Sequence, residues 1–159
     1  MYILGIDPGL SGALAFFDPR TNELIVEDMP TVEVRRNNKL KREVSAQLVA
    51  NIIVRKHVEA AFLERVNAMA GQGVTSVFSF GRSAGIMEGA LAAFDIPTTL
   101  VMPQAWQKAM KVRDGKDGSR ERAMQLFPAN AELFQRKKDD GRSDATLIAV
   151  YGHNQGKVT

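Results

Sequence analysis

The chain has 159 residues, of which 45% are hydrophobic and 25% charged, as is usual for one globular domain with a hydrophobic core. It has no cysteine, which excludes disulfides and thiolate metal sites, and no apolar run long enough to cross a bilayer. The formal net charge is only +3, so composition alone does not identify a partner. The N-terminal residues lead directly into an apolar strand without the basic segment of a signal peptide, so we expect a cytoplasmic protein.

Three apolar segments near the N-terminus predict β-strands. Residues 2–7 are apolar on both faces and are typical of a central strand, and residues 12–18 and 24–29 follow after tight turns. The two short connections predict an antiparallel meander. Residues 30–43 show no clear periodicity.

Helices and strands alternate over the remaining residues. The predicted elements are a helix at 44–57, a buried strand at 59–64, a long helix at 76–94, a strand at 97–102 and a helix from Pro103. Ser119 is a candidate N-cap of a short helix, and a last helix runs from Asp140 or Ser143 to Tyr151. This order predicts one α/β domain over residues 1–159, with a mixed five-stranded sheet, helices on both faces and the ribonuclease H-like pattern.

Four acidic residues stand at the ends of these apolar elements. Asp7 ends the first strand, Glu64 ends the strand at 59–64, and Asp140 and Asp144 open the last helix. Carboxylates at the ends of buried strands are costly unless positive charge meets them. If the fold brings these segments together, the natural partner is a pair of hard divalent cations, and two ions held by shared carboxylates hydrolyse phosphodiesters.

Each acid also has an ordinary structural interpretation. Asp7 lies in an Asp-Pro-Gly turn sequence, and Glu64 suits a solvated strand end. Asp140 and Asp144 lie one turn apart on one helix face and could share a cation, but acids also suit the positive end of a helix dipole. Asp139 is an alternative to Asp140, because the helix start is uncertain. Setting the four acids aside raises the formal charge from +3 to +7, a basic background that suits an enzyme of polyanions.

The order of these motifs resembles the RuvC family of Holliday-junction resolvases, and most closely its short phage and bacterial members. The resemblance begins with GIDPGLSG, continues with a strand ending in Glu64, and ends with the acidic pair before an apolar helix. The segments GQGVTSVFSFGRSAGIMEGAL, VMPQAWQKAM and GKDGSRERA extend it over nearly the whole chain. It implies a homodimer that resolves four-way DNA junctions by paired symmetric nicks with Mg²⁺ or Mn²⁺, without a small-molecule cofactor or a membrane.

The resemblance also assigns the site residues. Asp7 matches the first catalytic Asp, Glu64 the catalytic Glu, Asp144 the last acid and Asp140 the remaining one. The last two acids are three residues apart in the best-known members and four apart here, and both spacings face one way on a helix. Two ions held by these four acids would activate water and stabilise the leaving 3′ oxygen, which leaves a 5′-phosphate and a 3′-hydroxyl.

Basic residues near the acidic segments are the expected contacts of the DNA backbone. These residues are Lys108, Lys111, Arg113, Lys116, Lys137 and Lys138. The basic run at 35–42 could also contact DNA, but it is at least as typical of solvated surface. Well-known members of the family carry an aromatic wedge after the catalytic Glu, where this chain offers only Met69, which could enter a base step or pack within the loop.

Small residues recur every four positions in the long helix and allow close packing, either on the sheet or across a dimer interface. They are Gly81, Gly85, Gly89 and Ala93, and the flanking Phe78 and Met87 could cover a partner at such an interface. Trp106 is interpreted as a core residue rather than a base-stacking platform. The alternative functions are a nuclease of structured RNA like the YqgF group, and a branched-DNA nuclease of broader specificity.

Overall fold

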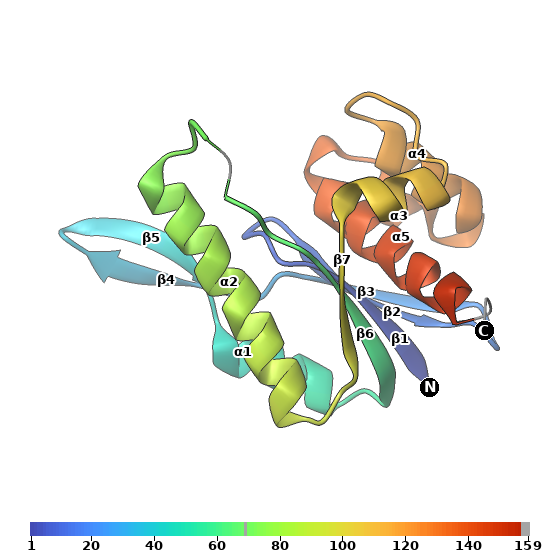
Figure 1. Ribbon diagram of the computed structural model, residues 1–159, viewed down its shortest axis with the longest axis horizontal. Coiled ribbons are helices and arrows are strands. Elements are labelled where there is room, and N and C mark those ends of the chain that lie inside the picture. The colour runs from blue at the N-terminus through green and yellow to red at the C-terminus, as the bar shows by residue number, and fades with distance from the viewer. Residues whose placement is uncertain (69, 157–159) are drawn as a thin grey trace.

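The structure is a computed structural model that describes residues 1–68 and 70–156. Its centre is a five-stranded sheet in the order β3-β2-β1-β6-β7 (Figure 1). The strands are β1 Tyr2–Asp7, β2 Ala13–Asp18, β3 Glu23–Asp28, β6 Val58–Glu64 and β7 Thr98–Val101. β1, β2 and β3 pair antiparallel, whereas β1, β6 and β7 pair in parallel. The predicted mixed sheet and its N-terminal meander are therefore confirmed.

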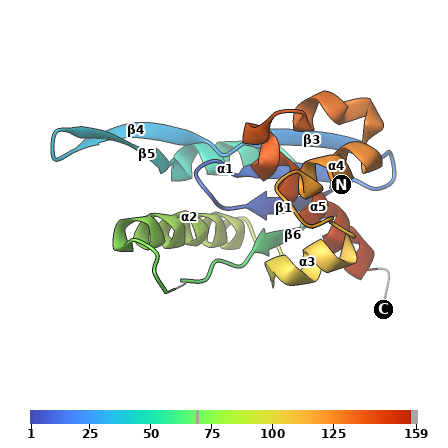
Figure 2. The same ribbon diagram turned by 90° about the horizontal axis from the view of Figure 1, so that it is seen from above.

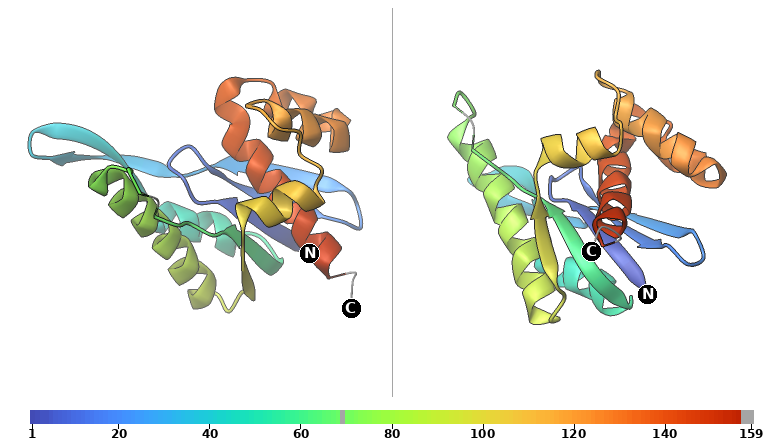
Figure 3. Two further views of the ribbon diagram at one scale, coloured as in Figure 1. Left: turned by 45° about the horizontal axis from the view of Figure 1, so that its top comes forward. Right: turned by 45° about the vertical axis from the view of Figure 1, so that its right-hand side comes forward.

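Helices cover both faces of this sheet, as predicted. Helices α1 (Ala46–Val54) and α2 (Val74–Ala93) lie on one side. Helices α3 (Pro103–Ala109), α4 (Gly118–Leu126) and α5 (Asp140–Gln155) lie on the other, with 3₁₀ turns at Pro128–Phe134 and Lys137–Asp139 (Figure 3). No helix among the described residues is long and apolar enough to span a membrane.

Side-chain size sets how close each layer of helices comes to the sheet. Large residues of β1 and β2, such as Leu4 and Phe16, form a core with α1 and α2. The opposite face presents small residues, such as Ala15, to α5. At Gly5 a Cβ atom would collide with the backbone of Ala145 and Ala149. The absence of a side chain there lets α5 lie directly on β1, which brings the start of α5 to the end of that strand.

Residues 31–44, which showed no clear periodicity in the sequence, form a hairpin. Strand β4 (Thr31–Arg36) pairs antiparallel with β5 (Lys39–Val44). Asn37 and Asn38 both adopt positive φ, 49° and 57°, as a two-residue hairpin turn requires. The hairpin projects beyond the main sheet beside α2 (Figure 2) and is exposed on most of its surface, so no apolar alternation marks it. The Asn pair was the only sequence signal.

Several element boundaries differ from the sequence prediction, most clearly in three helices. Helix α1 is shorter than predicted, because Ser45 caps it by accepting the Leu48 amide at 3.3 Å and β6 already begins at Val58. Helix α5 continues beyond Tyr151 to Gln155. Asp117 rather than Ser119 is the N-cap of α4, so Ser119 lies in the first turn and its hydroxyl is available for another role.

Candidate active site

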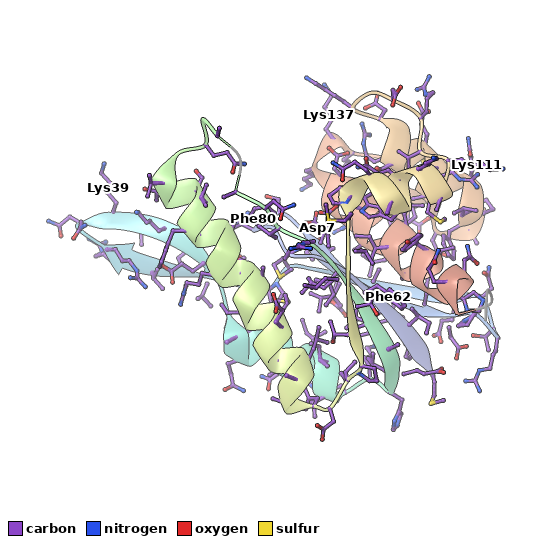
Figure 4. The ribbon with its side chains drawn as sticks, in the orientation of Figure 1. Asp7, Lys39, Phe62, Phe80, Lys111 and Lys137 are labelled. Atoms are coloured by element: carbon purple, nitrogen blue, oxygen red, sulfur yellow. The ribbon has the colours of Figure 1, made fainter. Side chains whose placement is uncertain are left out.

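Asp7 and Glu64 end two neighbouring parallel strands. Ile6 of β1 lies opposite Leu63 of β6 in the parallel register, so the next residue on each strand reaches the same edge of the sheet. Figure 4 shows Asp7 at this edge, between α2 and the helices on the other side of the sheet. The strand pairing therefore brings together two carboxyl groups that lie 57 positions apart in the chain.

Helix α5 supplies the other two acids. A Cβ atom at Gly141 would collide with the backbone of Ser11 and Gly12, so the first turn of α5 rests directly on the turn after β1. The nearby charges of Asp7, Glu64 and Asp140 all raise the pKa of Asp144. Asp7, Glu64 and Asp140 thus all lie within electrostatic reach of Asp144 at one end of the sheet.

The two strand-end carboxyl groups are poorly solvated. Burial raises the pKa of Glu64 to about 7, against the effect of the Trp106 indole, whose Nε1 donates to Glu64 Oε1 at 3.0 Å. Burial also raises the pKa of Asp7, against the Gly9 amide that donates to Asp7 Oδ1 at 3.1 Å. Because ionisation of either group is unfavourable without a compensating positive charge, this edge of the sheet is suited to binding cations.

Asp144 lies in the least compensated position of the four. Burial raises its pKa to about 7, and a hydrogen bond from the Ser119 side chain only partly opposes this effect. Its Oδ1 atom is buried and has no hydrogen-bond partner among the described residues. A buried carboxylate oxygen without a partner is destabilising unless a cation meets it.

The chemistry of this donor set suits a hard divalent cation, since all four side chains offer carboxylate oxygens. Within residues 1–68 and 70–156, however, no three Asp, Glu or His side chains are arranged as a metal-ligand set. One reason is that Asp140 is directed at Arg120, whose Nε donates to Asp140 Oδ1 at 2.7 Å. The site therefore has the residue types and the electrostatics of a metal centre. Asp140, however, makes an ion pair with Arg120 instead of facing the other acids.

Asp139 and Asp140 have different surroundings. Asp139 is 1% exposed and accepts bonds from the backbone and the guanidinium of Arg136, at 2.9 and 2.8 Å. Although burial alone would raise its pKa, the bonds from Arg136 keep the pKa of Asp139 below its usual range. The side chain of Asp140 is 54% exposed, and its charge reaches Asp144. Asp139 thus closes the turn before α5, and Asp140 stays the proposed ligand.

Three residues that contact the acids were missed or interpreted differently from the sequence. Trp106 is buried in the core, as predicted, but its indole also orients Glu64. Ser119 bonds Asp144 rather than capping a helix. Arg120 is 8% exposed and bonds Asp140, Asp117 and the Gln135 carbonyl. In the sequence, Ser119 and Arg120 were marked only by the segment GKDGSRERA, and nothing in that segment predicted their contacts with the acids.

Four of the six predicted DNA contacts lie on two exposed surfaces near the acids. Lys108 and Arg113 line a groove of about 360 Å³ that also contains Ser119, the partner of Asp144. Lys137 and Lys138 are exposed in the turn before α5. Two other residues, Lys111 and Lys116, are exposed, and Figure 4 shows Lys111 at the outer edge of the molecule, away from Asp7. Met69 lies outside the described residues.

The small-residue stripe of α2 faces away from the sheet. Gly81, Gly85 and Gly89 are exposed, and a Cβ atom on any of them would have no neighbour within 4 Å. Phe78 beside them is 72% exposed, whereas Met87 is fully buried and cannot cover a partner as predicted. The stripe therefore does not pack on the sheet, and its use as a dimer interface stays a prediction.

Comparison with known sequences gives one partial relative. No family model matches the chain. Over 77 residues it is 34% identical to the protein described as Holliday junction resolvase MOC1, chloroplastic, of Chlamydomonas reinhardtii. The match covers 48% of this chain but only 8% of the algal protein, so the chain spans a small part of the length of this relative.

Comparison with solved structures covers the whole chain. Thermus thermophilus RuvC in complex with a Holliday junction substrate superposes with a TM-score of 0.69 at 13% identity, over 99% of this chain and 96% of RuvC. A second Thermus thermophilus RuvC structure gives a TM-score of 0.61 at 15% identity, with the same coverage. The chain therefore has the ribonuclease H-like fold of RuvC, as its sequence motifs predicted.

Proposed function

We propose that this chain is a structure-specific endonuclease that resolves four-way DNA junctions by paired symmetric nicks and acts as a single domain. The observation that carries the proposal is the burial of Asp7, Glu64 and Asp144 at one end of a RuvC-like sheet, with Asp140 within electrostatic reach of Asp144 and the pKa of both Glu64 and Asp144 at about 7. The partial similarity to an algal junction resolvase supports the same substrate. A cytoplasmic location stays a prediction, because the description of that relative places it in the chloroplast.

Asp7, Glu64, Asp140 and Asp144 would hold Mg²⁺ or Mn²⁺, in two ions per site. Bound ions of this kind supply activation of the attacking water and stabilisation of charge on the leaving 3′ oxygen. The Trp106 indole donates to one oxygen of Glu64, and the Gly9 amide donates to one oxygen of Asp7. The Oδ1 atom of Asp144, which has no hydrogen-bond partner within the described ranges, is available as a ligand atom. Because the carboxyl groups of Glu64 and Asp144 are partly protonated near pH 7, cation binding would displace protons from them.

We also propose that the protein acts as a homodimer, because two symmetric nicks require two sites. The exposed face of α2 is the proposed interface, since Gly81, Gly85 and Gly89 leave room for another backbone to approach closely. Phosphate contacts are assigned to the basic residues named from the sequence. These are Lys108, Lys111, Arg113, Lys116, Lys137 and Lys138.

The proposal is tested by cleavage of a labelled mobile four-way junction, a linear duplex and an RNA–DNA hybrid, with and without Mg²⁺. We expect metal-dependent symmetric nicks on the junction alone. Cleavage of structured RNA in preference to the junction would support the YqgF-like alternative. Equal cleavage of forks, flaps and junctions would support a branched-DNA nuclease of broader specificity.

A further inference from the structure

A cavity of about 550 Å³ lies beside the acidic cluster, between β5, the turn after β1 and the N-terminal half of α2. Its volume falls in the range of about 300–1,000 Å³ that is usual for small-molecule sites. Lys41 and Arg42 line it from β5, Phe80 lines it from α2, and its other walls include the hydroxyls of Ser11 and Ser79. Figure 4 shows Phe80 on the side of α2 that faces Asp7.

The cavity and the acidic cluster share the turn after β1. A Cβ atom on Gly9 would lie 3.4 Å from Asp7 Oδ1 and 3.9 Å from Phe80 Cε2, so one backbone turn touches both. Arg42 Nη2 donates to the Leu10 carbonyl at 3.0 Å and to Ser11 Oγ at 3.1 Å, which ties the hairpin to the same turn. A DNA strand with a phosphate at Asp7 would therefore have its neighbouring nucleotide beside this cavity.

Lys41 and Arg42 in the cavity wall make no ion pair with a carboxylate among the described residues. Both acceptors of Arg42 are neutral, and Lys41 has no acidic partner in the part of the chain that the structure describes. Glu43, the acid lining the adjoining pocket, is already paired with Arg36 at 2.9 Å and Arg82 at 2.6 Å. The cavity is thus suited to an anionic ligand.

Phe80 supplies a surface of a different kind. It is half-buried and belongs to none of the core clusters of the described residues, although other aromatic residues of similar burial pack against them. An aromatic ring at the wall of a cationic cavity is the combination with which proteins bind single-stranded nucleic acid, because the base stacks on the ring while the cations hold the phosphate. The serine hydroxyls can donate to or accept from a base edge.

We propose that this cavity binds one nucleotide of the substrate strand next to the scissile phosphate, with its phosphate at Lys41 and Arg42 and its base against Phe80. The proposal rests on the proposed function, since the ligand is part of the branched DNA. Nucleotides at a strand crossover cost less to unstack than those within a duplex. Contacts to the base edge would make this cavity a source of cleavage-sequence preference.

The test uses the full chain and a four-way junction that carries 2-aminopurine at each position flanking the crossover in turn. Binding in EDTA should change the fluorescence strongly at one position, where the base meets Phe80. Phe80→Leu keeps an apolar side chain but loses the ring, and Phe80→Tyr keeps the ring. Lys41→Ala removes a cation from the cavity, whereas Lys39→Ala removes one from the hairpin tip, which does not line it (Figure 4).

We expect Phe80→Leu and Lys41→Ala to lose the signal at that position and to raise the KM for junction cleavage by about 5-fold or more, with a smaller change in kcat. Phe80→Tyr and Lys39→Ala should keep the signal. If Phe80→Leu fails to fold, the exposed Lys41 decides the outcome through its own variant. A wild type that cleaves junctions, with unchanged signal and KM in both cavity variants, would refute the cavity proposal alone. A wild type that neither binds nor cleaves branched DNA would refute the proposed function, and this proposal with it.

Discussion

Glu64 and Asp144 hold protons in the folded protein that the unfolded chain releases at lower pH. The pKa of each is about 7 because burial disfavours the charged form, against ordinary values of 4.5 for Glu and 3.8 for Asp. At pH values between the ordinary pKa and about 7, the native state binds more protons than the unfolded state. The free energy of unfolding therefore decreases as pH rises through this range. Carboxyls with lowered pKa, such as Asp28 beside the Arg142 guanidinium, titrate below this window and do not offset the effect.

We therefore expect the metal-free protein to melt at a lower temperature at pH 8 than at pH 5. We expect the two melting temperatures to differ by at least about 3 °C, which corresponds to roughly 1 kcal/mol of unfolding free energy for a chain of this size. Thermal melts in EDTA at several pH values measure this difference. Added Mg²⁺ should remove most of the loss at pH 8, because it stabilises the charged carboxylates. A melting temperature that stays constant or rises from pH 5 to pH 8 would contradict this account.

Replacement of Asp144 by Asn should separate activity from stability. The substitution removes a buried charge whose Oδ1 has no partner among the described residues. We expect loss of detectable junction cleavage, retained junction binding, and a metal-free melting temperature at pH 8 equal to or above that of the wild type. Gel shifts, cleavage assays and thermal melts check the three parts. Wild-type cleavage by the variant would remove Asp144 from the proposed site.

Asp139 and Asp140 should respond in opposite ways to replacement by Asn. Asp139→Asn breaks the bonds from Arg136 to a carboxylate that is 1% exposed, which should cost about 1–3 kcal/mol of stability and preserve cleavage per folded molecule. Asp140→Asn should lower cleavage with little change in stability, because its side chain is 54% exposed. The comparison uses denaturant unfolding together with cleavage rates. The reverse pattern would make Asp139 the ligand.

At the scale of single elements, helix α2 and the β4–β5 hairpin have exposed residues that packing on the sheet does not explain. Gly in a helix interior costs about 1 kcal/mol relative to Ala, and three exposed glycines in α2 gain nothing from the sheet to offset it. Close packing against a second copy would offset this cost. The hairpin likewise has mostly exposed strands.

Gly85→Glu in α2 should convert a dimer to a monomer, because the new side chain is both charged and too large for a close helix contact. The matched control is Gln47→Glu, which adds the same charge to the exposed surface of α1. Sedimentation velocity measures the mass, and the fraction of junctions nicked on both strands measures the coupling of the two sites. A monomeric wild type, or a Gly85→Glu variant with the mass of a dimer, would disprove the proposed interface.

At the scale of the whole molecule, charge is distributed unevenly. The formal charge of +3 becomes +7 when bound cations neutralise the four acids, so metal binding should strengthen attraction to DNA. The exposed Lys108 lies in the groove that contains Ser119, beside the acidic end of the sheet. Arg55 lies at the end of α1 just before β6 begins, and thus at the opposite end of that strand from Glu64.

Lys108→Ala should lower the salt dependence of junction binding, and Arg55→Ala should not. Each phosphate contact that is lost reduces the slope of log K against log salt by about 0.9. Fluorescence anisotropy across a series of salt concentrations measures both slopes, without a need for cleavage. Equal slopes for the two variants would show that Lys108 makes no phosphate contact.

From the amino-acid sequence alone we predicted the antiparallel meander, the alternation of helices and strands, and the positions of four acids at element ends. These predictions were possible because apolar periodicity and turn residues are local signals. The hairpin at 31–44 was missed because its exposed strands lack that periodicity. The sequence did not predict that Asp139 pairs with Arg136, that Trp106 orients Glu64, or that Met87 lies in the core. Those outcomes depend on which side chains meet across distant segments, and hydrogen bonding and burial act only after the chain has folded.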